Sequence, residues 1–211
     1  MHVAELWRYS VKSLAGERLD AVEVGADGFA GDRRVHVRGP RDRVLTARTH
    51  PRLLGLHGTL GPDGEPRVDG HPWSSAEAAA AVQRAAGPEA RLARWDGPER
   101  FDVLPLTVLT DGAIARFEAD PRRLRPNLIV AGVDGMAEQT WPGRELEIGA
   151  VRIGVAKVRQ RCVMTTYDPD TQVQDLGILR RIVDEFGGSL ALDCFVIRGG
   201  RLAVGDPVVL R

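Results

Sequence analysis

Residues 159–171 read Arg-Gln-Arg-Cys-Val-Met-Thr-Thr-Tyr-Asp-Pro-Asp-Thr and hold one of the two cysteines in the 211-residue chain. Arg159 and Arg161 stand just before Cys162 and favour its thiolate, which is the nucleophilic and metal-binding form of the side chain. A thiolate is a soft ligand that suits a transition metal. Asp168-Pro169 is typical of a tight turn. Taken alone, Cys162 could also be a small apolar residue of a buried strand, so this stretch leaves both interpretations open.

The pattern Arg-Cys-x-x-Thr-Thr-x-Asp-Pro-Asp-Thr, which begins at Arg161, resembles the signature of the MOSC domain family, named after the C-terminal domain of molybdenum cofactor sulfurase. Six further segments resemble motifs of this family and of the N-terminal β-barrel region that accompanies it, in the family's order. They are residues 6–13 (Leu-Trp-Arg-Tyr-Ser-Val-Lys-Ser), 28–33 (Gly-Phe-Ala-Gly-Asp-Arg), 45–53, 124–130 (Leu-Arg-Pro-Asn-Leu-Ile-Val), 137–141 (Ala-Glu-Gln-Thr-Trp) and 204–208 (Val-Gly-Asp-Pro-Val). Together they cover most of the chain and resemble the amidoxime-reducing type of member.

The composition is that of an ordinary globular protein. A chain of 211 residues fits one large domain or two small ones, and 43% of its residues are hydrophobic. The 29 basic and 29 acidic residues give a formal net charge of zero, which argues against a nucleic acid or an anionic membrane surface as partner. Only Lys12 and Lys157 are lysines, so all other basic residues are arginines and a single Arg is weak evidence of function.

The two cysteines are unevenly placed and predict no disulfide framework, which indicates a reducing compartment. The first residues, Met-His-Val-Ala-Glu, show no apolar secretory core. No apolar run approaches membrane-spanning length. We therefore expect a cytoplasmic protein with no membrane segment.

The first half of the chain predicts a meander of short strands, most simply a small barrel or curled sheet. A helix follows at residues 74–86, with a capping-box pattern at Ser74 and Glu77 and a stop at Gly87-Pro88. The polar connection at residues 88–104 suggests a division into a β-barrel-like region, 1–87, and a second domain, 88–211. The expected strands are residues 3–9, 19–24, 33–38, 43–47, 52–60 and 66–69.

The second half predicts more strands and two helices. One helix starts at Thr110-Asp111, and the other spans residues 175–186 with an apolar face. Gly149-Ala150 and Gly199-Gly200 predict hairpin turns. The expected strands are residues 127–131, 144–148, 151–158, 160–166, 190–198, 201–204 and 207–210. The fold class is therefore α+β, β-barrel-rich, with about three helices. The resemblance implies an N-terminal barrel packed on a MOSC barrel, with the cofactor between them.

The resemblance also implies the site residues. Cys162 would be the protein ligand to molybdenum, and hence the catalytic residue. The cofactor's pterin and phosphate need donors, which the fork of Arg and the compact charge of Lys supply. The cofactor-binding candidates at positions matching the family's motifs are Lys12, Ser13, Arg33, Thr110, Arg125, Asn127 and Arg161.

Several of these residues have an alternative, purely structural explanation. Thr110 could cap a helix, and Asn127 could satisfy buried backbone groups. On a regular strand Arg161 and Cys162 would point to opposite faces, so both reach one cofactor only if the strand begins or bulges there. Cys194 lies in an apolar run and is predicted to be a core residue.

The resemblance implies an enzyme that reduces N-hydroxylated compounds by N–O cleavage at a Cys162-ligated molybdenum. The alternative is a carrier of the molybdenum cofactor, or of persulfide sulfur on Cys162, without turnover of its own. Two cysteines cannot hold an iron–sulfur cluster of the four-cysteine kind, so an enzyme would need a separate electron-transfer protein of the ferredoxin, flavoprotein or cytochrome type. Lys157 alone is poor evidence for pyridoxal phosphate. The other expected partner is a small-molecule substrate.

Overall fold

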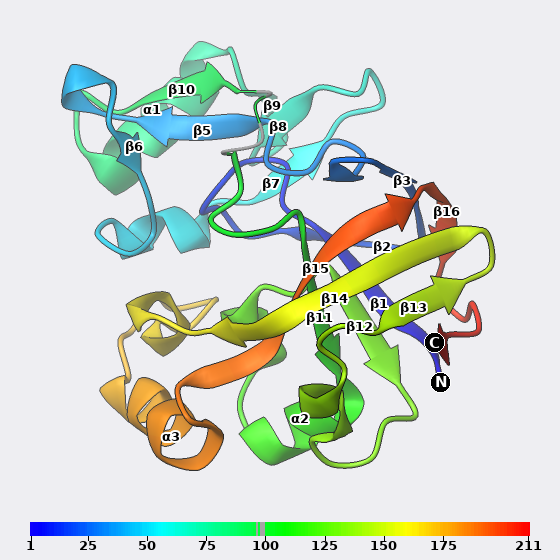
Figure 1. The fold of residues 1–211 in the computed structure, drawn as a ribbon. Helices are drawn as coiled ribbons and strands as arrows, with labels where there is room; N and C mark the ends of the chain where they lie inside the picture. The colour runs from blue at the N-terminus through cyan, green and yellow to red at the C-terminus, as the bar shows by residue number, and fades with distance from the viewer. Residues whose placement is uncertain (96, 98–99) are drawn as a thin grey trace.

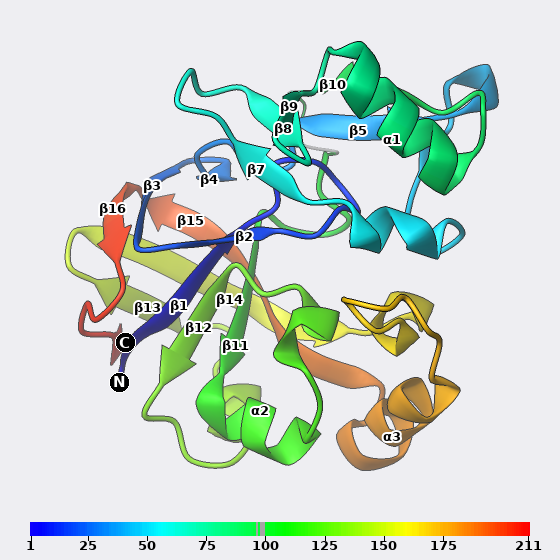
Figure 2. The ribbon, with the colours of Figure 1, turned by 180° about the vertical axis from the view of Figure 1, so that it is seen from behind.

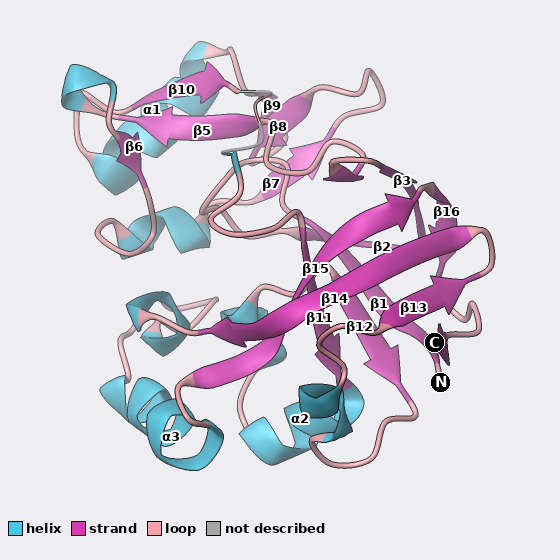
Figure 3. Cartoon of the chain, in the orientation of Figure 1, coloured by secondary structure: helices cyan, strands magenta, loops and turns pink. Residues whose placement is uncertain are grey.

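The computed structural model describes residues 1–95, 97 and 100–211. Its architecture is α+β, as predicted, with several sheets and, in this part of the chain, three α-helices (Figure 3). The helices are α1 (Ala76–Ala86), α2 (Asp111–Phe117) and α3 (Leu176–Phe186). In the views of Figures 1 and 2, α1 lies at the top of the molecule and α2 and α3 lie at the bottom.

An eight-stranded sheet forms the lower part, in the order β17-β13-β14-β15-β11-β12-β1-β2. Its strands are β1 (His2–Arg8), β2 (Glu17–Leu19), β11 (Leu106–Thr110), β12 (Leu128–Ala131), β13 (Glu145–Ile148), β14 (Val151–Gln160), β15 (Ser189–Arg198) and β17 (Val209–Leu210). β1 pairs with β12, so the start of the chain is built into the same sheet as its second half. The two termini lie side by side (Figure 1). The predicted division at residues 87 and 88 stays a prediction.

The main core lies against this sheet. Alternate side chains of its strands are fully buried, among them Leu6, Leu128 and Ile153. Burying a side chain of this size stabilises the fold by about 1.5–3 kcal/mol. Cys194 belongs to the same core and is 0% exposed, as predicted for a core residue.

Smaller sheets build the upper part and one edge. They have the orders β10-β5-β6, β16-β3-β4 and β7-β8-β9. Their strands are β3 (Ala21–Gly25), β4 (Gly28–Phe29), β5 (Val35–Arg38), β6 (Val44–Leu45), β7 (Gly58–Leu60), β8 (Pro66–Val68), β9 (His71–Pro72), β10 (Arg91–Arg94) and β16 (Gly200–Ala203). A second core joins Val35 and Val37 of β5 to Ala78 and Val82 of α1.

Two features around α1 differ from the sequence prediction. Its N-cap is Ser75, whose hydroxyl accepts from Ala78 N at 3.2 Å, so the predicted cap at Ser74 is one residue off. The connection expected at residues 88–104 contains β10, which pairs with β5. Residues 96, 98 and 99 of that connection lie outside the described residues.

The predicted strand at residues 160–166 is wrong. β14 ends at Gln160, and residues 163–166 form the 3-10 helix η6 (Val163–Thr166). The hydroxyl of Thr165 donates to Cys162 O at 2.9 Å, and that of Thr166 donates to Val163 O at 2.6 Å. Such local bonds offer the backbone an alternative to a strand ladder.

The predicted hairpin at Gly199-Gly200 is also wrong, because β16 turns away from β15 and pairs with β3. A Cβ at Gly199 would lie 2.3 Å from Val24 O, so this close approach requires glycine. The predicted apolar face of α3 is only partly buried. Ile182 and Phe186 pack inward, whereas Leu176 and Val183 are 51% and 54% exposed, because the helix docks through only one side of a wide stripe.

Candidate functional site

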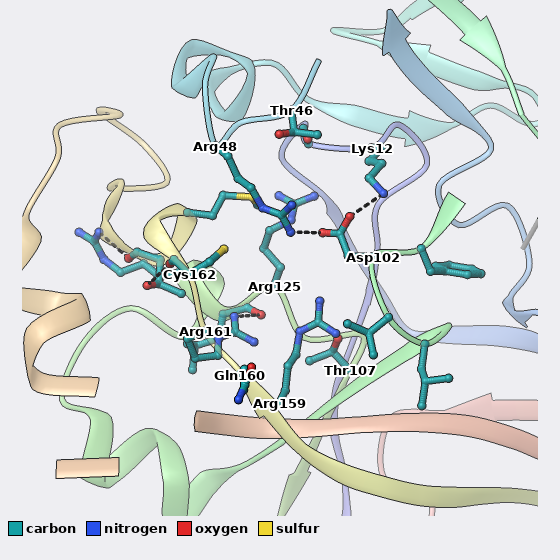
Figure 4. A pocket seen from close by; sticks show the side chains of 18 of the residues that line it. Lys12, Thr46, Arg48, Asp102, Thr107, Arg125, Arg159, Gln160, Arg161 and Cys162 are labelled. Atoms are coloured by element: carbon teal, nitrogen blue, oxygen red, sulfur yellow. Dashed lines mark hydrogen bonds and ion pairs between the residues drawn. The ribbon is translucent and has the colours of Figure 1, made fainter. Parts of the chain in front are cut away.

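A pocket of about 160 Å³ lies where the N-terminal region meets the residues that surround Cys162 (Figure 4). Seven cationic side chains line it, against one carboxylate, Asp102, among the described lining residues. We call it the cationic pocket. Its cationic residues are Lys12, Arg33, Arg48, Arg123, Arg125, Arg159 and Arg161.

Cys162 enters this pocket because of the backbone irregularity that follows β14. The residue is extended, with φ −137° and ψ 178°, and it is the N-cap of η6. The strand has already ended at Gln160, so Arg161 and Cys162 both line the pocket, which a regular strand would not permit. The cysteine is unpaired and partly exposed.

Arg161 is partly buried and has few partners. Its Nη2 donates to Leu124 O at 2.7 Å, while Nε and Nη1 have no hydrogen-bond partner among the described residues. Burial, with the charge of Arg159, lowers the pKa of Arg161 to about 9. A buried donor left unsatisfied costs about 1–3 kcal/mol, so these nitrogens favour a ligand that brings acceptors.

The residue before a proline is usually extended, and Arg125 precedes Pro126. It is instead left-handed, with φ 51°, because it closes the 3-10 helix η4 (Pro121–Leu124), where its N–H bonds Arg122 O at 3.1 Å. Its guanidinium stacks 4.1 Å from the ring centroid of Tyr9. Its Nη2 is buried, and no hydrogen-bond partner for it lies in the described part of the chain. Burial lowers the pKa of Arg125 to about 10.

Lys12, Ser13 and Arg33 line the pocket from the N-terminal region. Lys12 Nζ lies 2.8 Å from Asp102 Oδ1 and donates to Arg100 O at 2.9 Å. Burial lowers the pKa of Lys12, and the charge of Asp102 opposes this. Arg33 pairs with Asp32.

Thr110 and Asn127 do not line the cationic pocket. Thr110 is fully buried, caps α2 by accepting from Ala113 N at 3.1 Å, and donates to Glu138 Oε2 at 3.1 Å. Asn127 lies beneath the pocket, where its amide donates to Trp7 O at 3.2 Å and accepts from Thr107 N at 3.2 Å. Both residues therefore have the structural roles that the sequence left open for them.

Sequence reasoning missed Arg48, Asp102 and Arg159, which also line the pocket. Asp102 Oδ2 accepts from Arg48 Nη2 at 2.9 Å, so one carboxylate bridges Arg48 and Lys12 (Figure 4). Arg159 pairs with buried Asp193. The high arginine content hid Arg48 and Arg159, although both stand in or next to the segments that carried the resemblance.

Arg48 links the N-terminal region to the thiol. Burial lowers its pKa, but the interactions with Asp102 and with the Cys162 side chain outweigh this and raise it. Its side chain is 44% exposed, whereas that of Lys12 is 11% exposed. Arg48 is therefore the accessible cation beside Cys162.

Residues 104–209 match the MOSC domain, and residues 1–97 match the MOSC N-terminal beta barrel domain. This chain belongs to the MOSC domain family. The resemblance drawn from the motifs is confirmed, and so is the β-barrel-rich α+β fold class. The YUAD protein from Bacillus subtilis supports the fold alone, with a TM-score of 0.55 at 12% identity over 99% of this chain and 94% of that chain.

Two human relatives of this MOSC protein have names that state an activity. Mitochondrial amidoxime reducing component 2 of Homo sapiens is 35% identical over 126 residues, which covers 51% of this chain and 37% of that protein. Mitochondrial amidoxime-reducing component 1 of Homo sapiens is 34% identical over 128 residues, which covers 52% of this chain and 37% of that protein. The matches thus span little more than a third of these relatives. Among the described residues, no helix has both the length and the apolar character needed to cross a membrane.

Proposed function

We propose that this MOSC protein holds a pterin-based molybdenum cofactor in the cationic pocket and reduces N-hydroxylated compounds by cleaving their N–O bond. The observation that supports the proposal most is the meeting of the Cys162 thiol with seven cationic side chains in one pocket. The relatives named amidoxime reducing components support the reaction class.

The residues of the pocket fit such a cofactor. Its phosphate and the edges of its pterin need hydrogen-bond donors, and Arg125 and Arg161 have buried nitrogens without partners among the described residues. Cys162 is a soft ligand for the metal. Lys12, Ser13, Arg33, Arg125 and Arg161 would hold the phosphate and pterin, and Cys162 would be the protein ligand to the metal.

The reaction adds two electrons and two protons to an N-hydroxylated compound and yields the amine or amidine and water. When bound, the cofactor supplies two-electron chemistry at its metal, and the protein supplies orientation and electrostatics. Arg48, the accessible cation beside Cys162, can donate hydrogen bonds to the substrate oxygen. Asp102 orients Arg48 by accepting a hydrogen bond from its Nη2.

The electrons must come from outside the chain. Its two cysteines cannot ligate a four-cysteine iron–sulfur cluster, and Cys194 is buried in the core. We therefore propose a separate electron-transfer protein that carries flavin, haem or iron–sulfur as the donor.

Turnover tests this function. Protein produced in a host that makes the cofactor should reduce an amidoxime with an artificial reductant, and should not do so with NADH alone. Retained molybdenum without turnover of amidoximes or hydroxylamines would favour the carrier function instead. Rapid reduction by NADH with the pure protein would contradict the need for a donor protein.

Cofactor retention should depend on Lys12 and Arg125. Replacing either by Ala removes charge-assisted hydrogen bonds worth about 1.5–3 kcal/mol, which is roughly a tenfold to hundredfold loss in affinity. Molybdenum content after gel filtration measures this loss. Arg18 is 59% exposed, so Arg18→Ala is the control and should change stability by no more than about 0.5 kcal/mol. Full retention in both pocket variants would refute the assignment of these two residues.

A further inference from the structure

Asp102 is the only carboxylate among the described residues that line the cationic pocket, and it lies between two of the cations. Its Oδ1 is 2.8 Å from Lys12 Nζ, and its Oδ2 accepts from Arg48 Nη2 at 2.9 Å. Figure 4 shows the carboxylate reaching toward both side chains. Carboxylate and phosphate oxygens compete for the same cationic donors, so Asp102 takes the part of an anionic ligand at these two cations.

The segment that carries Asp102 is anchored to the N-terminal region. Lys12 also donates to Arg100 O at 2.9 Å, and the guanidinium of Arg100 stacks 4.5 Å from the ring centroid of Phe101. Arg100 is 3% exposed, and its Nη2 donates to Asp27 O at 3.1 Å. These contacts hold the backbone just before Asp102, so the carboxylate stays at the wall of the pocket.

The surrounding charges keep Asp102 ionised. Burial raises the pKa of this carboxyl, but the charges of Lys12 and Arg48 outweigh this and lower it. A second anion bound to Lys12 or Arg48 would therefore lie next to a fixed negative charge. Like charges at such short range repel strongly in a partly buried site.

We propose that Asp102 determines which anions occupy the cationic pocket, because it holds Lys12 and Arg48 until a ligand with further contacts displaces it from Lys12. The proposal rests on the proposed function, in which Lys12 holds part of a phosphate-bearing cofactor. Asp102 is then a specificity-determining residue that keeps small inorganic dianions, such as sulfate, out of the pocket.

The size of the ligand decides whether it can overcome Asp102. A small dianion offers little besides its charge, whereas a larger ligand would also gain hydrogen bonds from Arg125 and Arg161, whose buried nitrogens lack partners among the described residues. Asp102 thus weakens the binding of both ligands, and only the ligand with these further contacts stays bound. Release of Lys12 leaves the bond between Asp102 Oδ2 and Arg48 in place.

Titration of the cofactor-free protein with sulfate tests the proposal without any turnover. Sulfate carries two negative charges near neutral pH and has no proton to donate, so it cannot form a hydrogen bond with the Asp102 carboxylate. Calorimetry should show that the wild type binds sulfate with a Kd weaker than about 1 mM. Tighter binding than this would overturn the proposal, and the measurement needs only the wild-type chain.

Removal of the charge provides the second test. Asp102→Asn keeps the size of the side chain and should bind sulfate at least about tenfold more tightly than the wild type. Asp102→Glu keeps the charge and should bind sulfate as weakly as the wild type. Glu147→Gln is the matched control, because Glu147 pairs with Arg211 and does not line the pocket. This control loses the same charge and should leave sulfate binding unchanged.

The sign of the effect separates this role from a structural one. Loss of a residue that only supports the pocket would weaken sulfate binding, whereas removal of a competing charge strengthens it. Equal or weaker binding in Asp102→Asn, verified as folded by thermal unfolding, would overturn the proposal, as would tighter binding in Glu147→Gln. If Asp102→Asn does not fold, Asp102→Ser removes the same charge and gives the same comparison.

Molybdenum content separates this proposal from the proposed function. If the wild type retains molybdenum and folded Asp102→Asn binds sulfate no more tightly, only the role of Asp102 is refuted. If sulfate binding follows the prediction but the wild type retains no molybdenum, the proposed function is refuted and the role of Asp102 in excluding small anions stands.

Discussion

Cys162→Ser is expected to abolish amidoxime reduction while the protein stays folded. A hydroxyl is a harder and poorer partner for the metal than a thiolate. Cys162 is only partly buried, so its replacement should cost at most about 1–3 kcal/mol of stability. Some cofactor should remain, because the cations of the pocket are unchanged. Turnover per folded molecule and molybdenum content, measured on the same sample, check this result.

Cys194→Ser is the matched control, since Cys194 is the other cysteine and is 0% exposed. Burial raises the pKa of Cys194 and keeps it a neutral core thiol. Its replacement should lower stability by about 1–3 kcal/mol and leave turnover per folded molecule normal. Comparable activity in wild type and Cys162→Ser would refute the ligand role of Cys162. Loss of activity in folded Cys194→Ser would mean that the wrong cysteine was assigned.

Arg161→Met should have opposite effects on stability and on cofactor retention. Replacing a buried, poorly paired ion by an apolar side chain of similar volume is often neutral or stabilising by about 1–4 kcal/mol. The gain should lie at the lower end, because Leu124 O loses its donor. The variant should nevertheless retain little molybdenum, since two buried nitrogens that face no protein acceptor are lost.

The pH dependence of unfolding tests whether the poorly paired charge of Arg161 destabilises the folded protein. Folding lowers the pKa of Arg161 to about 9, so above that pH the unfolded chain binds more protons than the folded one. The cofactor-free wild type should therefore gain stability as the pH rises through about 9, relative to Arg161→Met. Urea unfolding at pH 7 and pH 10 measures this, with exposed Arg18→Met as control. A variant destabilised by more than about 2 kcal/mol at pH 7 would show that Arg161 is well satisfied without a ligand.

The sequence predicted the elements whose signals are local. Ser and Gly residues around α1 marked its ends to within one position, and alternation marked β13 and β14 with their turn at Gly149-Ala150. It could not predict that β16 leaves β15 for β3, because that choice depends on the approach of Gly199 to a distant carbonyl. It also missed the 3-10 turn after Gln160, which depends on hydroxyl bonds from Thr165 and Thr166.

The site shows the same limit. Motif position placed Lys12, Arg33 and Arg125 at the pocket, since these residues stand in ordered patterns. Arg48 stands in one of the motif segments but was hidden by the high arginine content, and Asp102 stands outside them. Their pairing joins residues 54 positions apart. Thr110 was a cofactor-binding candidate, but its hydroxyl caps α2. A helix cap and a cofactor contact both use a hydroxyl side chain, so the sequence alone does not distinguish the two roles. Distinguishing these cases requires the three-dimensional contacts.

The central claim is that the cationic pocket holds a molybdenum cofactor. The most direct measurement is metal analysis combined with pterin fluorescence, on protein purified from a host that makes the cofactor. We predict one molybdenum and one pterin per chain, both reduced in the Lys12→Ala and Arg125→Ala variants. Molybdenum and pterin no higher than background in the folded wild-type protein would contradict the claim.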